Sequence, residues 1–180
     1  MSGRHAKFFI GLTTTTAMAL SGTIGVFSQA ASARSVQYYR VLAYSAEGAN
    51  TIVVGMNGRA TKVRIIGINA PDATAKFNSK AGCYGIQARN VLKKIIRNNP
   101  VQLVADPKMP DRYTDGSLLR YVYVSKYGDV GATMIYNGAA KEYMYKHKNY
   151  GQRSWYRNLQ NMAYSANRGL WNARACPKNR

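Results

Sequence analysis

The distribution of hydrophobic and polar residues along this chain predicts short strands. β-Branched and aromatic residues gather in runs that are separated by Gly- and Asn-containing turns, a pattern typical of strands. Five strands are expected, at 38–45, 51–54, 61–68, 101–106 and 118–124. The turns AEGAN and GMNG separate the first three, which therefore form a meander.

Three further segments show the periodicity of helices. Apolar residues recur at spacings of three and four within 84–100, and Pro100 ends that segment. Helices are also expected at about 130–137 and about 153–168. The order β-β-β-α-β-β-α-α predicts an α+β fold, a closed five-stranded antiparallel barrel of the OB type with three helices. Such barrels commonly bind oligonucleotides on one face.

Residues 1–33 have the pattern of a cleavable signal peptide. A positively charged start precedes an apolar, Thr-rich stretch, and 31–33 form an A-x-A cleavage signal. A single anchoring helix is the alternative, but the four consecutive Thr and the small residues before the cut favour cleavage after Ala33. We therefore expect a secreted, monomeric protein, with one domain at 34–180 and no stable membrane insertion after cleavage.

The composition of residues 34–180 is strongly basic. Without Arg4 and Lys7, this part carries 24 of the 26 Lys and Arg and all 7 Asp and Glu, a net charge of about +17. The excess is spread along the whole segment, so it is not a basic tail. Nucleic acid is the expected partner, and an anionic wall polymer or membrane surface is the alternative. A highly charged protein without a specific polyanion partner is the plainer interpretation.

Cysteine and histidine counts restrict the chemistry further. Cys83 and Cys176 are expected to form one disulfide if the protein is exported, and two free thiols are the alternative. His147 is the one His outside the leader, so a His-based zinc site and a paired-His ribonuclease site are excluded. An enzyme built on this sequence would have to use carboxylates, Arg and a metal ion.

Four stretches in order resemble motifs of the staphylococcal nuclease (thermonuclease) family. NTIVV resembles its D-G-D-T strand start, and VRIIGINAPD resembles R-L-x-G-I-D-x-P-E. CYGIQARNVLKK resembles the helix opening of secreted members, and DRYTDGSLLRYVYV resembles D-R/K-Y-G-R-x-L-A-Y-V. The resemblance covers about 41–171 and implies the same barrel. It also implies that a Cys after GLW pairs with the Cys before Tyr-Gly.

In that family, charged groups around the scissile phosphate perform calcium-dependent phosphodiester hydrolysis. The resemblance implies that Arg64 holds the phosphate and that Asp72 stands where a Glu acts as general base. The two calcium carboxylates fall on Asn50 and Asn69, and a carbonyl ligand falls on Ala70.

The second Arg of the family, which stabilises the developing charge, falls on Ser117. Two amides in place of two carboxylates remove the charge on which calcium affinity depends. We therefore expect calcium binding and hydrolysis to be weak or lost. In a shifted alignment, Glu47 supplies one carboxylate. In a purely structural interpretation, Arg64 pairs with Asp72 and holds the turn, and Asp72 is a simple turn residue.

The resemblance also implies a nucleotide-binding surface. Tyr113, Tyr143 and Tyr145 match family tyrosines that line the nucleotide pocket, and Arg112 and Lys146 add charge beside them. Aromatic faces stack on any base without sequence preference. A Tyr-rich edge that merely covers the barrel is the alternative.

Three functions fit these residues. The first, which we favour, is a secreted protein that binds single-stranded DNA or RNA and cleaves it poorly or not at all. The second is an active calcium-dependent endonuclease with an unusual ligand set. The third is a non-catalytic surface protein that binds anionic polymers.

Overall fold

The computed structural model describes residues 38–44, 49–73, 82–97 and 99–177. All of them belong to one compact unit, Ser35–Arg180, and the unit Met1–Arg34 lies outside the described residues. The signal peptide and Glu47 therefore stay predictions. Among the described residues, no helix combines the length and hydropathy needed to cross a membrane.

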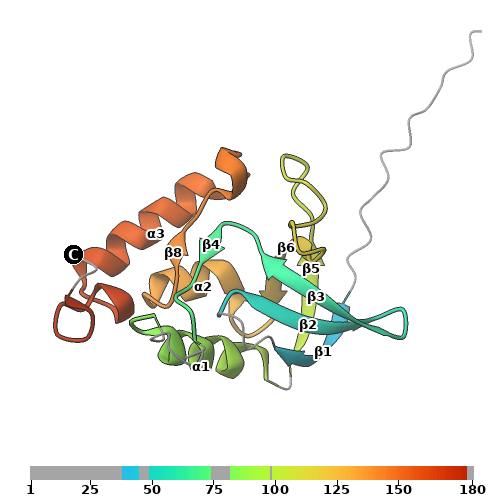
Figure 1. The fold of residues 1–180 in the computed structure, drawn as a ribbon, viewed down its shortest axis with the longest axis horizontal. Coiled ribbons are helices and arrows are strands. Elements are labelled where there is room, and N and C mark those ends of the chain that lie inside the picture. Colours follow the sequence, from blue (N-terminus) through green and yellow to red (C-terminus); the bar gives the residue numbers. More distant parts are fainter. Residues whose placement is uncertain (1–37, 45–48, 74–81, 98, 178–180) are drawn as a thin grey trace, which may run out of the picture. The chain divides into compact units, whose positions relative to one another are not determined.

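Five strands form a closed ring (Figure 1). Antiparallel pairing joins β1 to β2, β2 to β3, β1 to β5 and β5 to β6. The ring closes through β3 and β6, which are parallel, so the expectation of a wholly antiparallel barrel was wrong at this seam. The strands are β1 (Tyr38–Tyr44), β2 (Thr51–Met56), β3 (Arg59–Ile65), β5 (Pro100–Val104) and β6 (Leu118–Val124).

Three short strands extend this framework. β7 (Gly128–Asp129) pairs with the end of β6, and β4 (Ile68–Asn69) pairs with β8 (Lys141–Glu142). They are too short for a two-residue alternation to be recognised in the sequence. The β4–β8 pair ties the end of the meander to the segment that follows the second helix.

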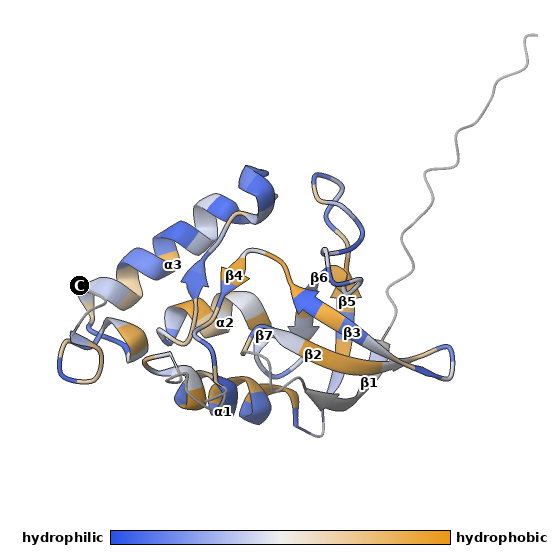
Figure 2. Cartoon of the chain, in the orientation of Figure 1, coloured by the Kyte–Doolittle hydropathy of each residue, from blue (hydrophilic) through white to orange (hydrophobic). Residues whose placement is uncertain are grey.

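The three predicted helices are confirmed. They are α1 (Gly85–Ile96), α2 (Val130–Tyr136) and α3 (Arg153–Ser165). α2 contacts both other helices and lies between them in Figure 1. Figure 2 shows that much of α3 is hydrophilic, because this helix buries only a narrow face that includes Tyr156 and Ala163. Two 3₁₀ turns, η1 (Tyr145–His147) and η2 (Gly169–Trp171), complete the chain order.

The meander differs from its prediction in two places. The hairpin turn between β2 and β3 has only two residues, Asn57 and Gly58, both at positive φ. Both strands therefore extend further toward the turn than predicted, and β2 includes two residues that were assigned to a four-residue turn. The expected strand 61–68 breaks at Gly67, where φ is +81°. A Cβ at this glycine would lie 2.6 Å from the Tyr150 ring, so the chain bends where only glycine fits.

One continuous hydrophobic core fills the barrel and extends under α1 and α2. A second, smaller cluster contains Ala163, Leu170 and Trp171. The predicted disulfide is confirmed between Cys83 and Cys176, and it joins the segment before α1 to the segment after η2.

Candidate nucleic-acid site

Arg64 lies on β3 between two core residues. Val63 and Ile65 are buried, so strand alternation turns the side chain of Arg64 toward the opposite face. The guanidinium carbon lies 4.2 Å from the centre of the Tyr113 ring. This is cation–π geometry, which an Arg adopts readily because its guanidinium is planar and weakly hydrated. The basic residue in the apolar run is therefore tied to an aromatic ring.

Tyr113 also contacts a second aromatic ring. The ring centres of Tyr113 and Tyr145 are 4.5 Å apart, with planes inclined by 40°. The ammonium of Lys146 lies 5.5 Å from the centre of the Tyr145 ring. These contacts join residues of β3, the loop before β6 and η1 into one cluster, in which two rings lie between two cations. We call Arg64, Tyr113, Tyr145 and Lys146 the ring–cation cluster.

Backbone contacts hold the loop that carries Tyr113. The N–H of Tyr113 donates to the carbonyl of Ser117 at 2.8 Å, and Gly116 N–H donates back to the Tyr113 carbonyl at 3.0 Å. The Arg112 guanidinium donates to the Gly116 carbonyl at 2.7 Å and lies 3.8 Å from Asp111. Arg112 therefore braces this loop and is not one of the stacked groups.

Tyr143 is attached to the barrel through its backbone. Its N–H donates to the carbonyl of Gly67 at 2.9 Å, and its half-buried side chain packs against the main core. The ring contacts of the cluster involve the other two tyrosines, Tyr113 and Tyr145. Of the three tyrosines that the sequence predicted to line one pocket, only Tyr113 and Tyr145 therefore contact each other through their rings in the part of the chain that the structure describes.

Asp115 is a site residue that the sequence alone did not reveal. Its carboxylate accepts the backbone N–H of Ser117 at 2.9 Å and also the Ser117 hydroxyl. These hydrogen bonds, followed by the positive charges of Arg64 and Lys62, hold the pKa of Asp115 below its ordinary value. The signal was present in Asp-Gly-Ser, a pattern typical of turns in which the Asp side chain caps the backbone.

Ser117, at the second arginine position, is buried and bound to Asp115. A neutral hydroxyl and a carboxylate therefore occupy the position with which the family's second Arg was aligned. The positive charges of Arg64 and Lys62 both act on the Asp115 carboxylate.

The positions that match calcium ligands lie around β2 and β4. Asn50 is only 3% exposed, and its amide oxygen accepts the Thr51 hydroxyl at 3.3 Å. Asn69 is exposed on β4 and Ala70 follows it. Both line a cavity of about 250 Å³ together with Lys141 and Cys83. Asp72 is exposed beyond the turn. Within the described ranges, no three His, Cys, Asp or Glu side chains gather in a way that could hold a metal ion.

Comparison with known proteins identifies the family of this chain. Residues 62–173 match the family model described as staphylococcal nuclease homologue. The chain is 29% identical to a thermonuclease of Staphylococcus hyicus over 122 residues, which cover 68% of this chain and 69% of that protein. It is 34% identical to a thermonuclease of Staphylococcus intermedius over 110 residues, 61% of this chain and 60% of that protein.

A third relative is an uncharacterized protein of Methanocaldococcus jannaschii, 22% identical over 153 residues. The family model covers more than half of the chain, and the barrel has the closure and the three helices that the sequence predicted. The chain therefore belongs to the family of staphylococcal nuclease homologues.

Proposed function

We propose that this protein is a secreted nucleic-acid-binding protein whose phosphodiester hydrolysis is weak or lost. Its ligand is single-stranded DNA or RNA, and the strand lies across the ring–cation cluster. The observation that carries the proposal is the stack itself, in which Arg64 faces Tyr113 at 4.2 Å and Tyr113 meets Tyr145 at 4.5 Å.

Binding is supported by the chemistry of the cluster. Aromatic rings stack on bases irrespective of sequence, and cations beside them attract the phosphates of the same strand. Family membership implies contact with nucleic acid in general, and the chain's formal net charge is +19. A single strand exposes its bases, whereas a duplex hides them from such rings.

Loss of calcium-dependent hydrolysis is supported by the donor set. Calcium prefers several oxygen ligands, and its affinity rises with the number of carboxylates. Asn50 and Asn69 are neutral, and Asn50 already uses its amide oxygen for Thr51. The residues at these positions therefore do not fit a tightly bound calcium ion.

The surroundings of Arg64 support the same conclusion. The carboxylate of Asp115 acts on Arg64 electrostatically and opposes the approach of a phosphate. Ser117 supplies no positive charge. Removal of one charged donor aimed at the transition state commonly lowers the rate by ~10²–10³-fold.

Secretion is supported by the leader pattern of residues 1–33 and by the disulfide. Disulfides persist in oxidising compartments, and Cys83 and Cys176 form a disulfide.

The test is a nuclease assay on heat-denatured DNA, with calcium and with chelator. A variant carrying Asn50→Asp, Asn69→Asp and Ser117→Arg is assayed beside the native protein. We expect no calcium-dependent cleavage by the native protein and measurable cleavage by the variant. Calcium-dependent cleavage by the native protein would instead identify an endonuclease with an unusual ligand set.

Binding is measured in parallel on single-stranded DNA and on an anionic wall polymer. Preference for the DNA, lost on Tyr113→Ala substitution, supports the proposal. Equal binding of both polymers by the native and substituted proteins would favour a non-catalytic surface protein.

A further inference from the structure

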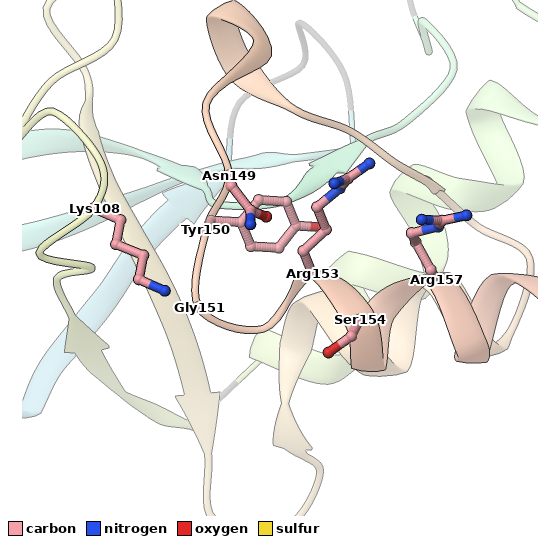
Figure 3. A pocket seen from close by; sticks show the side chains of 7 residues that line it. All are labelled: Lys108, Asn149, Tyr150, Gly151, Arg153, Ser154 and Arg157. Atoms are coloured by element: carbon pink, nitrogen blue, oxygen red, sulfur yellow. The ribbon is translucent and has the colours of Figure 1, made fainter.

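A second basic site lies at the start of α3 (Figure 3). It is a cavity of about 190 Å³ between the loop after β5 and the first turns of α3. Figure 3 shows Arg153 and Arg157 projecting side by side from the helix, with Lys108 across the segment 149–151. The lining residues are Lys108, Asn149, Tyr150, Gly151, Arg153, Ser154 and Arg157.

The charges around this cavity are not balanced. Arg153 lies 3.6 Å from Glu142, which also accepts the Tyr150 hydroxyl at 2.9 Å. Among the described residues, Lys108 and Arg157 form no ion pair. The cavity therefore presents two cations that form no ion pair beside one that is paired, and the charge of Lys108 also acts on the nearby Asp106 carboxylate.

The neighbouring carboxylate, Asp106, is bound to the backbone of the cavity walls. It is buried and accepts hydrogen bonds from the N–H groups of Lys108 and Gly151 and from the Tyr121 hydroxyl. It fixes the backbone of both walls of the cavity, and it leaves the Lys108 side chain exposed. The site is thus positioned by buried contacts and lined by exposed cations.

The donors in this cavity suit a phosphate group. Guanidinium groups match phosphate oxygens in a planar, bidentate manner, and the Ser154 hydroxyl and Asn149 amide offer further donors. α3 starts here without a side-chain cap and without an acidic residue in its first turn, so its partial positive charge adds to the field. The Tyr150 ring is buried, so it offers no face on which a base could stack.

The same two chain segments build both sites. The segment between β5 and β6 contributes Lys108 to the cavity and Tyr113 to the ring–cation cluster. The segment after β8 contributes Tyr145 to the cluster and Asn149 to the cavity. Asn149 follows Tyr145 by four positions, so their Cα atoms are at most about 14 Å apart.

The chain between the two sites is itself basic. Lys146, His147 and Lys148 are all exposed on η1 and the residue after it. A polyanion that leaves the ring–cation cluster along this segment reaches the cavity without crossing an acidic surface residue of that segment. Continuity of charge therefore favours one extended ligand over two separate ones.

We propose that the cavity between Lys108, Arg153 and Arg157 binds a backbone phosphate of the single strand whose bases stack on Tyr113. This inference rests on the proposed function and specifies where the strand runs: from the ring–cation cluster along η1 to the start of α3. A ligand of several nucleotides engages both sites, and a very short one engages the cluster alone.

The test compares two double variants with the native protein. Lys108→Gln/Arg157→Gln removes two exposed cations that form no ion pair among the described residues, so the fold is retained. Lys94→Gln/Arg97→Gln removes two exposed cations at the C-terminal end of α1, which Figure 1 shows away from α3 and η1, and it is the matched control. Binding of a labelled trinucleotide and of an oligonucleotide about fifteen nucleotides long is measured by fluorescence anisotropy across a range of salt concentrations.

The cavity variant should bind the long oligonucleotide about tenfold more weakly at low salt, and its salt slope should fall by about 1.4 for two lost phosphate contacts. Its affinity for the trinucleotide should match that of the control. Equal affinity of the two double variants for the long strand overturns the inference, while binding by the native protein keeps the proposed function.

Two further outcomes separate the possible sources of phosphate. Inorganic phosphate should displace the long strand more easily from the native protein than from the cavity variant. If it instead binds the cavity without any effect on strand affinity, the inference is wrong. If the native protein binds neither oligonucleotide, the proposed function fails, and the inference fails with it.

Discussion

The Arg64 guanidinium lies over the Tyr113 ring because the barrel closes between β3 and β6. Arg64 is aligned with Leu119 in this parallel pair, and the loop before β6 folds back through the Tyr113–Ser117 hydrogen bond. The closure therefore brings together the cation and the ring to which we assign phosphate binding and base stacking. A change at either residue should alter the binding of a strand more than it alters the fold.

Substitution of Tyr113 tests the stacking directly. Tyr113→Leu should weaken the binding of single-stranded DNA by ~1–3 kcal/mol, the usual contribution of one stacked base. Tyr113→Phe keeps the ring and should bind nearly as the native protein does. Fluorescence anisotropy measures both, and circular dichroism checks that both variants are folded. Equal affinities for the Leu and Phe variants would contradict a stacking role.

Much of the fold could be predicted because it depends on local patterns. The strand 118–124 is rich in apolar, β-branched and aromatic residues, and its observed bounds are the predicted ones. The helical periodicity of apolar residues in 84–100 indicated α1. The helix ends earlier than predicted, at Ile96, and Pro100 begins β5. The order of strands and helices predicted a closed barrel, and the family resemblance implied the same one, but the expectation of antiparallel strands missed the parallel β3–β6 pair that closes it.

The parts that could not be predicted depend on contacts between distant segments. The break at Gly67 is caused by the Tyr150 ring, far away in sequence. The role of Asp115 depends on its position near Arg64 across the barrel seam. Lys108 and Arg157 belong to no recognisable motif, and they line one cavity only because the loop after β5 meets α3.

Gly67 should tolerate substitution less well than another glycine at positive φ. Gly67→Ala adds a Cβ 2.6 Å from the Tyr150 ring and also strains the backbone, so overpacking adds ~1–3 kcal/mol to the cost. Gly58→Ala, at φ +72° with nothing within 4 Å, carries the backbone strain alone. Urea unfolding should give a clearly lower free energy of unfolding for Gly67→Ala than for Gly58→Ala. Similar losses of stability would show that the Tyr150 ring moves aside easily.

Loss of the disulfide should destabilise the protein strongly. Cys83 and Cys176 are 93 positions apart, so the bond restricts a large loop in the unfolded chain, and its removal should cost about 2–5 kcal/mol. Cys83→Ala/Cys176→Ala is compared with the native protein under oxidising and reducing conditions by urea unfolding. When reduced, the native protein should unfold at a urea midpoint close to that of the variant, and the midpoint of the variant should not change with reductant. A native midpoint that is unchanged by reduction would refute the prediction.

Two buried carboxyl groups should give opposite pH trends. Burial alone would raise the pKa of Asp106, but hydrogen bonds from Gly151, Tyr121 and the Lys108 backbone lower this pKa overall. The charged Asp106 therefore stabilises the fold above the unfolded pKa of about 3.8, and this stabilisation is lost as the pH falls below that value. Burial raises the pKa of Asp129 despite its hydrogen bonds. Its contribution is therefore present at low pH and is lost as the pH rises through the raised value.

The two Asn variants separate these effects. Relative to the native protein, Asp106→Asn should become more destabilising as the pH rises from about 3 to 6, because the native carboxylate gains its stabilisation in that window. Asp129→Asn should become less destabilising over the same range. Thermal unfolding at several pH values measures both trends. Parallel trends for the two variants would mean that the buried environment of Asp129 does not disfavour its charge.

Restoring the two carboxylates should create a dependence of stability on calcium. Asn50 is buried, so Asn50→Asp places a charge where desolvation disfavours it, while Asn69→Asp changes an exposed position. The double variant should therefore unfold at a lower temperature than the native protein in chelator. Calcium should recover the difference, because an ion that binds only the folded state stabilises it by mass action. The native protein should unfold at the same temperature with and without calcium, as should Asn90→Asp, an exposed control on α1. A calcium-dependent rise for the native protein would show that the two amides hold the ion, and the interpretation of the site as a binding surface without calcium chemistry would be wrong.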